Sequence, residues 1–291
     1  MTLMMLIRRS TLVLGLSLMT TSSYANPLPA PTSYEFKQLL PTSAFQSSQA
    51  ILDYQQALIA QLAPFGDLSG QLQLKEQGAI NFYDTKGCRL NQQGLLLRHR
   101  LHHDQWQLTL KLRNINRQLL SESPLMATGE LQADVLAKPK RYTIYSITSS
   151  QPIDKVPLHL ALLAQSFPAL AQLPKFNALG SLALLPLSKP ELQQAVYKGL
   201  SLKLGQHKLK FSLTFWSKTP QGTPSIAEIS FEISNKKHKL NNDALQTADL
   251  ILDKIAQMPA WKSSIDSTKT QWVYQHASSL CQQNKRGDLG S

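Results

Sequence analysis

Acidic residues are scarce in this chain. Of its 291 residues, 18 are Asp or Glu and 30 are Lys or Arg, so the formal net charge is +12 at pH 7. Such a balance attracts polyanions, among them nucleic acid, anionic lipid, phosphorylated metabolites and polyphosphate, and does not choose among them. No long apolar run follows the first 25 residues, so no later segment is expected to span a bilayer.

Cysteine is scarce as well. Cys88 and Cys281 are the only two, and in an exported chain they are able to form a disulfide that ties the C-terminal tail to the turn after Asp84. Two cysteines so far apart in sequence can equally be distant in space, so the sequence leaves the pairing open. Neither Cys nor His falls at a zinc spacing. The adjacent pair His102-His103 is expected to be exposed at a hairpin tip.

The N-terminus reads as a signal peptide. Arg8 and Arg9 precede an apolar run over 11–19, and small residues follow it. The run is far shorter than the roughly 20 residues that a membrane-spanning helix needs. We therefore expect residues 1–25 to be removed on export by the general secretory route. The mature protein is then expected to be periplasmic or secreted, with a formal net charge of +10 once the two arginines are lost.

The remaining chain is expected to form one domain. A leader over 26–32 carries three prolines and reads as an extended segment, the domain covers 33–275, and a tail follows over 276–291. No internal repeat or low-complexity linker interrupts the domain. Period-two alternation predicts strands at 33–40, 79–85, 95–102, 105–113, 130–136, 142–148, 181–186, 194–203, 207–216 and 225–234. Helical spacing predicts helices at 47–63, 158–173 (broken at Pro168) and 243–258.

Charged side chains share one face of several predicted strands. Arg98 and Arg100 lie on one face, for example, with leucines opposite, because side chains two apart in a strand point the same way. An antiparallel sheet with one wet face would also alternate in this way. The abundance of charge on the polar faces and the continuity of the apolar faces favour a closed barrel with a charged interior and helices outside.

Several short motifs lie in and around these strands. In chain order they are Glu35-Phe36-Lys37, Asp84-Thr85, Leu90, Gly94, Leu97-Arg98-His99-Arg100, Thr109-Leu110-Lys111, Glu228-Ile229-Ser230-Phe231-Glu232, Thr268-Lys269 and Tyr274. Together they resemble the pattern of the CYTH superfamily, the triphosphate tunnel metalloenzymes, and the resemblance covers about 33–275.

The resemblance implies an α+β fold: a closed antiparallel tunnel of eight strands with flanking helices, open at both ends. It implies binding of triphosphate-like groups and usually their hydrolysis with Mg²⁺ or Mn²⁺. The implied phosphate-binding residues are Lys37, Arg98, Arg100, Lys111 and Lys269, and the implied metal ligands are Glu35, Glu228 and Glu232. Arg offers a planar fork of donors to phosphate oxygens, Lys acts as a point charge, and both metals prefer oxygen ligands.

The sequence also departs from the family pattern. Serine replaces glutamate at Ser33 and Ser230, and Thr214 stands where the family has an aspartate. Basic positions of the family fall near Gln193 and Thr128. Hydroxyl groups are poor replacements for carboxylates around a divalent cation. We therefore expect a weakened metal site, whereas anion binding can survive.

Three hypotheses follow for the function. The first is an exported protein that binds triphosphate, polyphosphate or a related phosphorylated polyanion, with residual hydrolysis. The second is an active, metal-dependent inorganic triphosphatase or polyphosphatase, and the third is a non-catalytic envelope interaction module. Asp84 is expected to serve the turn rather than a metal, and no nucleic-acid recognition motif accompanies Trp106 and Trp216. The sequence fixes neither the natural ligand, nor turnover, nor the metal, nor the oligomeric state.

Overall fold

The structure is a computed structural model that describes residues 28–137, 141–174, 176, 179–235, 239–263 and 267–281. The expected signal peptide, over 1–25, and most of the expected tail lie outside these residues. Within the described ranges, none of the helices combines the length and the apolar character that crossing a membrane requires.

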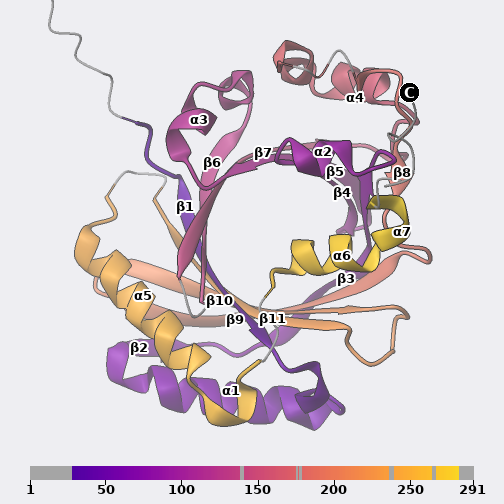
Figure 1. The fold of residues 1–291 in the computed structure, drawn as a ribbon. Coiled ribbons are helices and arrows are strands. Elements are labelled where there is room, and N and C mark those ends of the chain that lie inside the picture. Colours follow the sequence, from indigo (N-terminus) through magenta and orange to yellow (C-terminus); the bar gives the residue numbers. More distant parts are fainter. Residues whose placement is uncertain are drawn as a thin grey trace, which may run out of the picture.

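Nine strands pair side by side into a closed ring (Figure 1). Around the ring the order is β9-β10-β11-β1-β6-β7-β5-β4-β3, and the pairing of β3 with β9 closes it. The strands are β1 (Ser33–Leu40), β3 (Gln73–Asp84), β4 (Leu95–His102), β5 (Gln105–Asn114), β6 (Glu130–Leu136), β7 (Tyr142–Pro152), β9 (Leu192–Leu204), β10 (His207–Ser217) and β11 (Ile226–Ser234). Two short strands, β2 (Asp67–Ser69) and β8 (Leu185–Pro186), pair with β9 and β3 outside the ring.

The closed barrel with flanking helices confirms the predicted α+β class, with two corrections. The ring has nine strands instead of eight, and β1 pairs in parallel with β6. Neither the number of strands in the ring nor the direction of the β1–β6 pairing can be predicted from the alternation of polar and apolar residues. The alternation is similar in parallel and antiparallel strands, and it does not show which strands pair. The predicted strand over 181–186 is reduced to β8, which contributes nothing to the wall.

Helices cover the outside of the barrel in two places. Helices α1 (Ser48–Leu62) and α5 (Asn242–Ala256) pack on β1 and β9–β11, and α4 (Leu160–Ser166) packs on the opposite side (Figure 1). Both long helices begin at a side-chain cap: Ser47 accepts a hydrogen bond from the Ala50 N–H, and Asn241 accepts one from Ala244. Each fully buried leucine under them contributes about 2 kcal/mol through the hydrophobic effect.

The C-terminal segment lies over one end of the barrel. Helix α6 (Lys269–His276) extends across part of the ring's opening, and α7 (Ser278–Cys281) follows it toward α2 (Arg89–Gln92) (Figure 1). Thr268 and Gln271 form a capping box that fixes the start of α6. This arrangement carries Lys269, the first residue of α6, to the mouth of the barrel interior. A short helix α3 (Arg117–Ser121) packs on β5 and β7 outside.

A candidate anion-binding tunnel

The barrel encloses a cavity of about 640 Å³. Nine Lys or Arg residues and five Asp or Glu residues line it, so the cavity is net positive. The basic residues are Lys37, Arg98, Arg100, Lys111, Arg113, Lys198, Lys208, Lys210 and Lys269, and the acidic residues are Glu35, Glu76, Asp134, Glu228 and Glu232. All eight side chains that the resemblance assigned to phosphate or metal binding lie in this lining.

Lys37 lies between two carboxylates. Its Nζ is 2.9 Å from Glu35 Oε2 and 3.0 Å from Asp134 Oδ1. Burial alone would lower the pKa of Lys37, but the negative charges of Asp134 and Glu35 outweigh burial and raise its pKa. The ammonium group of Lys37 is therefore permanently charged and largely neutralised by these carboxylates.

Asp134 is shared by two cations. Besides Lys37, the Arg113 guanidinium lies 3.5 Å from Asp134 Oδ2. Burial would raise the pKa of Asp134, but the nearby charges, Lys37 foremost, hold it well below its usual range. Asp134 thus occupies part of the binding capacity of both Lys37 and Arg113.

Lys269 enters the cavity from the start of α6. Its Nζ lies 2.8 Å from Glu228 Oε1 and 5.2 Å from the centre of the Trp216 ring. The Glu228 side chain is buried, so this ion pair is shielded from solvent. The C-terminal helix therefore takes part in the charge distribution of the tunnel.

Arg98 and Lys111 have no carboxylate partner among the described residues. Arg98 reaches only the Thr109 hydroxyl, at 3.5 Å, and Lys111 Nζ donates to Gln132 Oε1 at 3.4 Å. Within the described part of the chain, the Nε groups of Arg98, Arg100 and Arg113 have no hydrogen-bond partner. Burial lowers the pKa of Arg98 and lowers that of Lys111 to about 8, although the negative charges of Asp134 and Glu35 partly oppose it. These groups are the ones best placed to receive an anion.

Two of the predicted metal ligands already pair with a lysine. Lys37 lies against Glu35, and Lys269 lies against Glu228. Strand register also places Glu35 between Glu232 and Asp134 on neighbouring strands. A divalent ion needs several anionic oxygens that are free to replace its water shell. Binding of Mg²⁺ or Mn²⁺ by Glu35, Glu228 and Glu232 therefore stays a prediction, and it would require the ion to compete with these lysines.

The departures from the family pattern fall partly inside the cavity. Ser230 and Thr214 line it, so hydroxyl groups do replace carboxylates there. Neither Gln193 nor Thr128, near which the family has basic residues, is among the residues that line the cavity, although the neighbouring Gln194 is. The hydroxyl replacements thin the acidic set on the lumen side of β10 and β11.

Sequence reasoning missed several tunnel residues. They are Arg113, Asp134, Glu76, Lys198, Lys208 and Lys210. The signal for Arg113 was present, because it shares the face of Lys111 two residues away. Glu76 on β3 and Lys198 on β9 form an ion pair although they are 122 positions apart in the sequence. No local sequence pattern predicts this contact.

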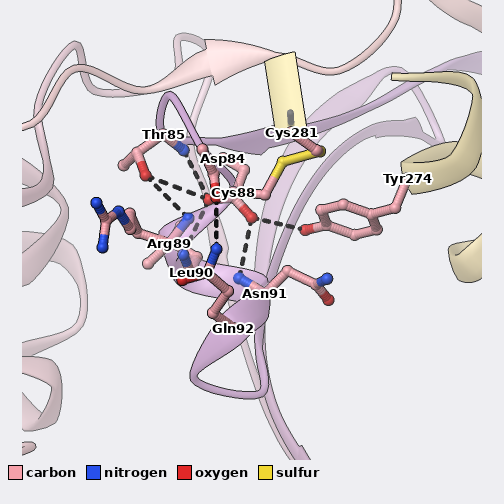
Figure 2. The surroundings of a disulfide bond; sticks show 10 residues. Asp84, Thr85, Cys88, Arg89, Leu90, Asn91, Gln92, Tyr274 and Cys281 are labelled. Carbon is pink, nitrogen blue, oxygen red and sulfur yellow. Dashed lines mark hydrogen bonds between the residues drawn. A yellow bond between two sulfur atoms is a disulfide. The ribbon is translucent and has the colours of Figure 1, made fainter. Parts of the chain in front are cut away.

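Asp84 organises the turn beside the tunnel instead of binding anything inside it. Figure 2 shows its carboxylate accepting hydrogen bonds from the N–H groups of Thr85, Leu90 and Asn91, at 2.7, 2.9 and 3.0 Å. The Tyr274 hydroxyl donates a fourth, at 3.1 Å. Asp84 is fully buried and absent from the cavity lining, in agreement with its expected role in the turn.

Cys88 and Cys281 form a disulfide next to this network (Figure 2). Gly87 also donates a backbone hydrogen bond to Leu280 O, at 2.9 Å. Together these contacts fix α7, and with it the end of α6, against the turn that precedes α2. The position of Lys269 in the tunnel is thereby tied to the β3–β4 connection.

Comparison with known proteins finds similar folds only among solved structures. No protein-family model and no curated protein matches the chain. A proposed adenylyl cyclase from Hippeastrum with a dominant triphosphatase activity is 14% identical, with a TM-score of 0.44 over 83% of this chain and 94% of its own. A proposed adenylate cyclase from Bacillus halodurans is 17% identical, with a TM-score of 0.38 over 83% and 98%. A Pyrococcus horikoshii protein is 8% identical, with a TM-score of 0.36 over 84% and 98%.

These identities and TM-scores are too low to carry an argument about activity. The fold itself is a closed barrel whose strands direct charged side chains into a shared interior.

Proposed function

We propose that this protein binds a triphosphate- or polyphosphate-like anion inside its tunnel. The observation that carries the proposal is the pair Arg98 and Lys111, which point into the cavity without a carboxylate partner among the described residues. Glu35 and Asp134 act on both cations without forming an ion pair with them, and a phosphate group would add negative charge in direct contact. A phosphate chain also spreads several charges along its length, which matches basic side chains on neighbouring strands.

The residues divide the work of binding. The Arg98 guanidinium offers a planar set of donors, including its unpartnered Nε, to two oxygens of one phosphate. Lys111 supplies a point charge on the adjacent strand β5, and Arg100 extends the row along β4. Lys37 and Lys269 are already paired, so they contribute to the field of the tunnel more than to direct contacts. Binding therefore needs no metal ion in this arrangement.

Hydrolysis is a second candidate function, favoured by the row of Glu232, Glu35 and Asp134 across three neighbouring strands. Mg²⁺ or Mn²⁺ held there would polarise a phosphoryl oxygen or activate water. The ion would first have to displace Lys37 from two carboxylates. We therefore rank binding above turnover, and the role of a scaffold that only docks a partner below both.

As part of the same proposal, the signal-like sequence of the N-terminus supports binding in the periplasm or outside the cell. A polyanion receptor there would meet phosphate compounds released into the envelope. The proposal is independent of the oligomeric state.

The test uses calorimetric titration of inorganic tripolyphosphate into the metal-free protein. We expect the double variant Arg98→Met/Lys111→Met to lose at least about tenfold in affinity, which is about 1.4 kcal/mol. Its ligand-free form should be at least as stable as the wild type, because two buried and mutually repelling cations are gone. A matched control, Lys86→Met/Lys262→Met, removes two charges from exposed positions and should bind normally.

Equal binding by the tunnel variant and the wild type would overturn the proposal. Phosphate release measured on the same samples, with and without Mn²⁺, decides between binding and turnover. Release that depends on the metal and disappears in Glu35→Gln would establish the second candidate.

A further inference from the structure

A group of metal-binding side chains lies at the end of the β4–β5 hairpin, apart from Lys37 and its carboxylates. His102 ends β4 and Gln105 begins β5, so His103 and Asp104 form a two-residue turn. Both turn residues have positive φ, 47° and 60°, as in a type I′ hairpin turn. Asn, Asp and His adopt positive φ more readily than other side chains, so His103 and Asp104 are compatible with this turn.

The turn brings the two imidazoles together above one carboxylate. The ring centres of His102 and His103 are 4.2 Å apart. Glu76, from the neighbouring strand β3, places Oε2 3.0 Å from His102 Nδ1. One ligand atom from each of the three residues lies within 4.8 Å of the others. Two strands and a strained turn thus converge on one point at the wall of the tunnel.

We propose that Glu76, His102 and His103 form a binding site for a transition-metal ion of the zinc class. Imidazole nitrogen and carboxylate oxygen are the ligands that Zn²⁺ takes from proteins, and two His with one Glu leave the fourth position to water. His103 is exposed and His102 is partly exposed, so the ion has an open path from solvent. The donor set differs from the all-oxygen set that Mg²⁺ or Mn²⁺ prefers.

The distance between Glu76 Oε2 and His102 Nδ1 is close to the distance between two ligands of one zinc ion. Two ligands of a tetrahedral zinc ion, each 2.0–2.1 Å from it, lie roughly 3.3 Å apart. The present separation of 3.0 Å is that of a hydrogen bond, in which a proton occupies the place between the imidazole and the carboxylate. Zinc would take that place, and the single proton of the neutral imidazole would move to Nε2, so His102 can bind the ion without releasing a proton. The ligand atom of His103 lies within 4.8 Å of the ligand atoms of the other two residues.

Two cations near Glu76 should weaken zinc binding, and one of them provides a further test of the proposal. Lys198 forms an ion pair with the other oxygen of Glu76, and Arg100 lies 4.0 Å from Oε2. The Lys198 side chain is 44% exposed, so it can turn into solvent when zinc takes the carboxylate charge. Removing the charge of Lys198 should therefore strengthen zinc binding, although it removes an ion pair from the fold.

The experiment titrates Zn²⁺ into the full, chelator-treated protein by calorimetry, with no phosphate compound present. We expect one zinc per chain and a loss of about tenfold or more in affinity in Glu76→Gln and in His102→Ala. The variant Lys198→Met should bind more tightly than the wild type. The double variant His159→Ala/His276→Ala, which removes two exposed histidines elsewhere, should match the wild type.

Cobalt(II) titration followed by visible absorption gives a second readout, because tetrahedral coordination has characteristic bands. Failure of the wild type to bind zinc would overturn the proposal, and so would binding that Glu76→Gln leaves unchanged. Unchanged binding in Glu76→Gln would show that the two histidines bind zinc at the surface without the carboxylate. A decrease in affinity in Lys198→Met would also count against it. None of these outcomes depends on whether tripolyphosphate binds, so the two proposals stand or fall separately.

Discussion

The Tyr274 hydroxyl donates a 3.1 Å hydrogen bond to Asp84, a carboxylate 190 positions earlier in the chain. The same carboxylate accepts three backbone hydrogen bonds around the start of α2 (Figure 2). One buried acidic group therefore joins the β3–β4 connection to the helix that carries Lys269. The geometry of the tunnel mouth depends on contacts that lie outside the tunnel.

Replacing Tyr274 by Phe removes this bond and leaves the ring in place. We expect the free energy of unfolding to fall by about 1.5–3 kcal/mol, the range for a hydrogen bond to a charged group. Urea denaturation followed by far-ultraviolet circular dichroism measures the change. Asp84→Asn should cost more, since it weakens all four bonds. An unchanged midpoint for Tyr274→Phe at constant slope would contradict the structural role assigned to this contact.

The disulfide between Cys88 and Cys281 joins residues separated by 193 positions. Closing so long a loop restricts the unfolded chain, and the chain-entropy relation gives about 5 kcal/mol as its upper contribution. We expect Cys88→Ser/Cys281→Ser to lose a large part of that free energy of unfolding. Denaturation of the wild type in reductant is the matched control and should give the same curve. If reductant leaves the wild-type curve unchanged, the disulfide contributes nothing to stability.

Lys111 should make anion binding dependent on pH. Its pKa is lowered to about 8, mainly by burial, so above that pH the ligand-free tunnel loses one positive charge. We expect the dissociation constant of tripolyphosphate to rise between about pH 7 and pH 9, and calorimetry at several pH values measures it. Lys111→Arg keeps its charge over that interval. Comparing the two proteins at each pH cancels the ionisation of the ligand itself.

The lowered pKa of Lys111 predicts that the free energy of unfolding increases with pH, whereas the affinity for tripolyphosphate decreases. Between pH 8 and the ordinary lysine pKa near 10.4, the unfolded chain holds a proton at Lys111 that the folded chain has released. The contribution of Lys111 to the free energy of unfolding therefore increases as pH rises through this window. Subtracting the curve of Lys111→Met isolates that contribution, and a flat difference would contradict the lowered pKa.

Asp134→Asn should separate stability from affinity. The substitution leaves Lys37 with one carboxylate and Arg113 without its ion-pair partner, which costs about 3–5 kcal/mol for a broken buried pair. Arg113 then lacks its carboxylate and Lys37 keeps only Glu35, so the tunnel is more positive and the folded variant should bind tripolyphosphate more tightly than the wild type. Thermal unfolding and calorimetry on one preparation give the two numbers. Weaker binding by a folded variant would show that Asp134 positions the cations instead of competing for them.

Acid should destabilise the protein by protonating Asp134. The pKa of Asp134 lies well below its usual range in the folded state, so its contribution is complete above the unfolded value near 3.9. It is lost as pH falls through the folded pKa, because protonation ends the pairing with Lys37. In Asp134→Asn the acid limb of the stability profile should be shallower.

Local patterns predicted the walls of the barrel well. The expected strands over 33–40, 95–102 and 130–136 coincide with β1, β4 and β6. Alternation also placed Arg98, Arg100 and Lys111 on the inner face, because the period of a strand fixes the side on which each residue points. The family motifs then brought Glu35 and Lys37 to the same interior as these residues.

Other features depend on how side chains and strands contact one another in space, which local sequence patterns do not predict. The parallel pairing of β1 with β6, the ion pair of Glu76 with Lys198 and the neutralisation of Glu35 by Lys37 are examples. Helices as short as α2 and α3 are unstable alone and form only against the barrel, so their periodicity is too brief to detect. The metal prediction counted carboxylates and could not include Lys37, which lies against Glu35, so metal binding stays a prediction.

The first strand of the barrel has β6 on one side and β11 on the other. A chain that emerges from its N-terminus exposes β1 as a bare hydrogen-bonding edge until residue 234 has appeared, since β11 ends there. Completion of the wall is consequently a late event in biosynthesis, and the tunnel cannot hold a guest before most of the polypeptide has been delivered.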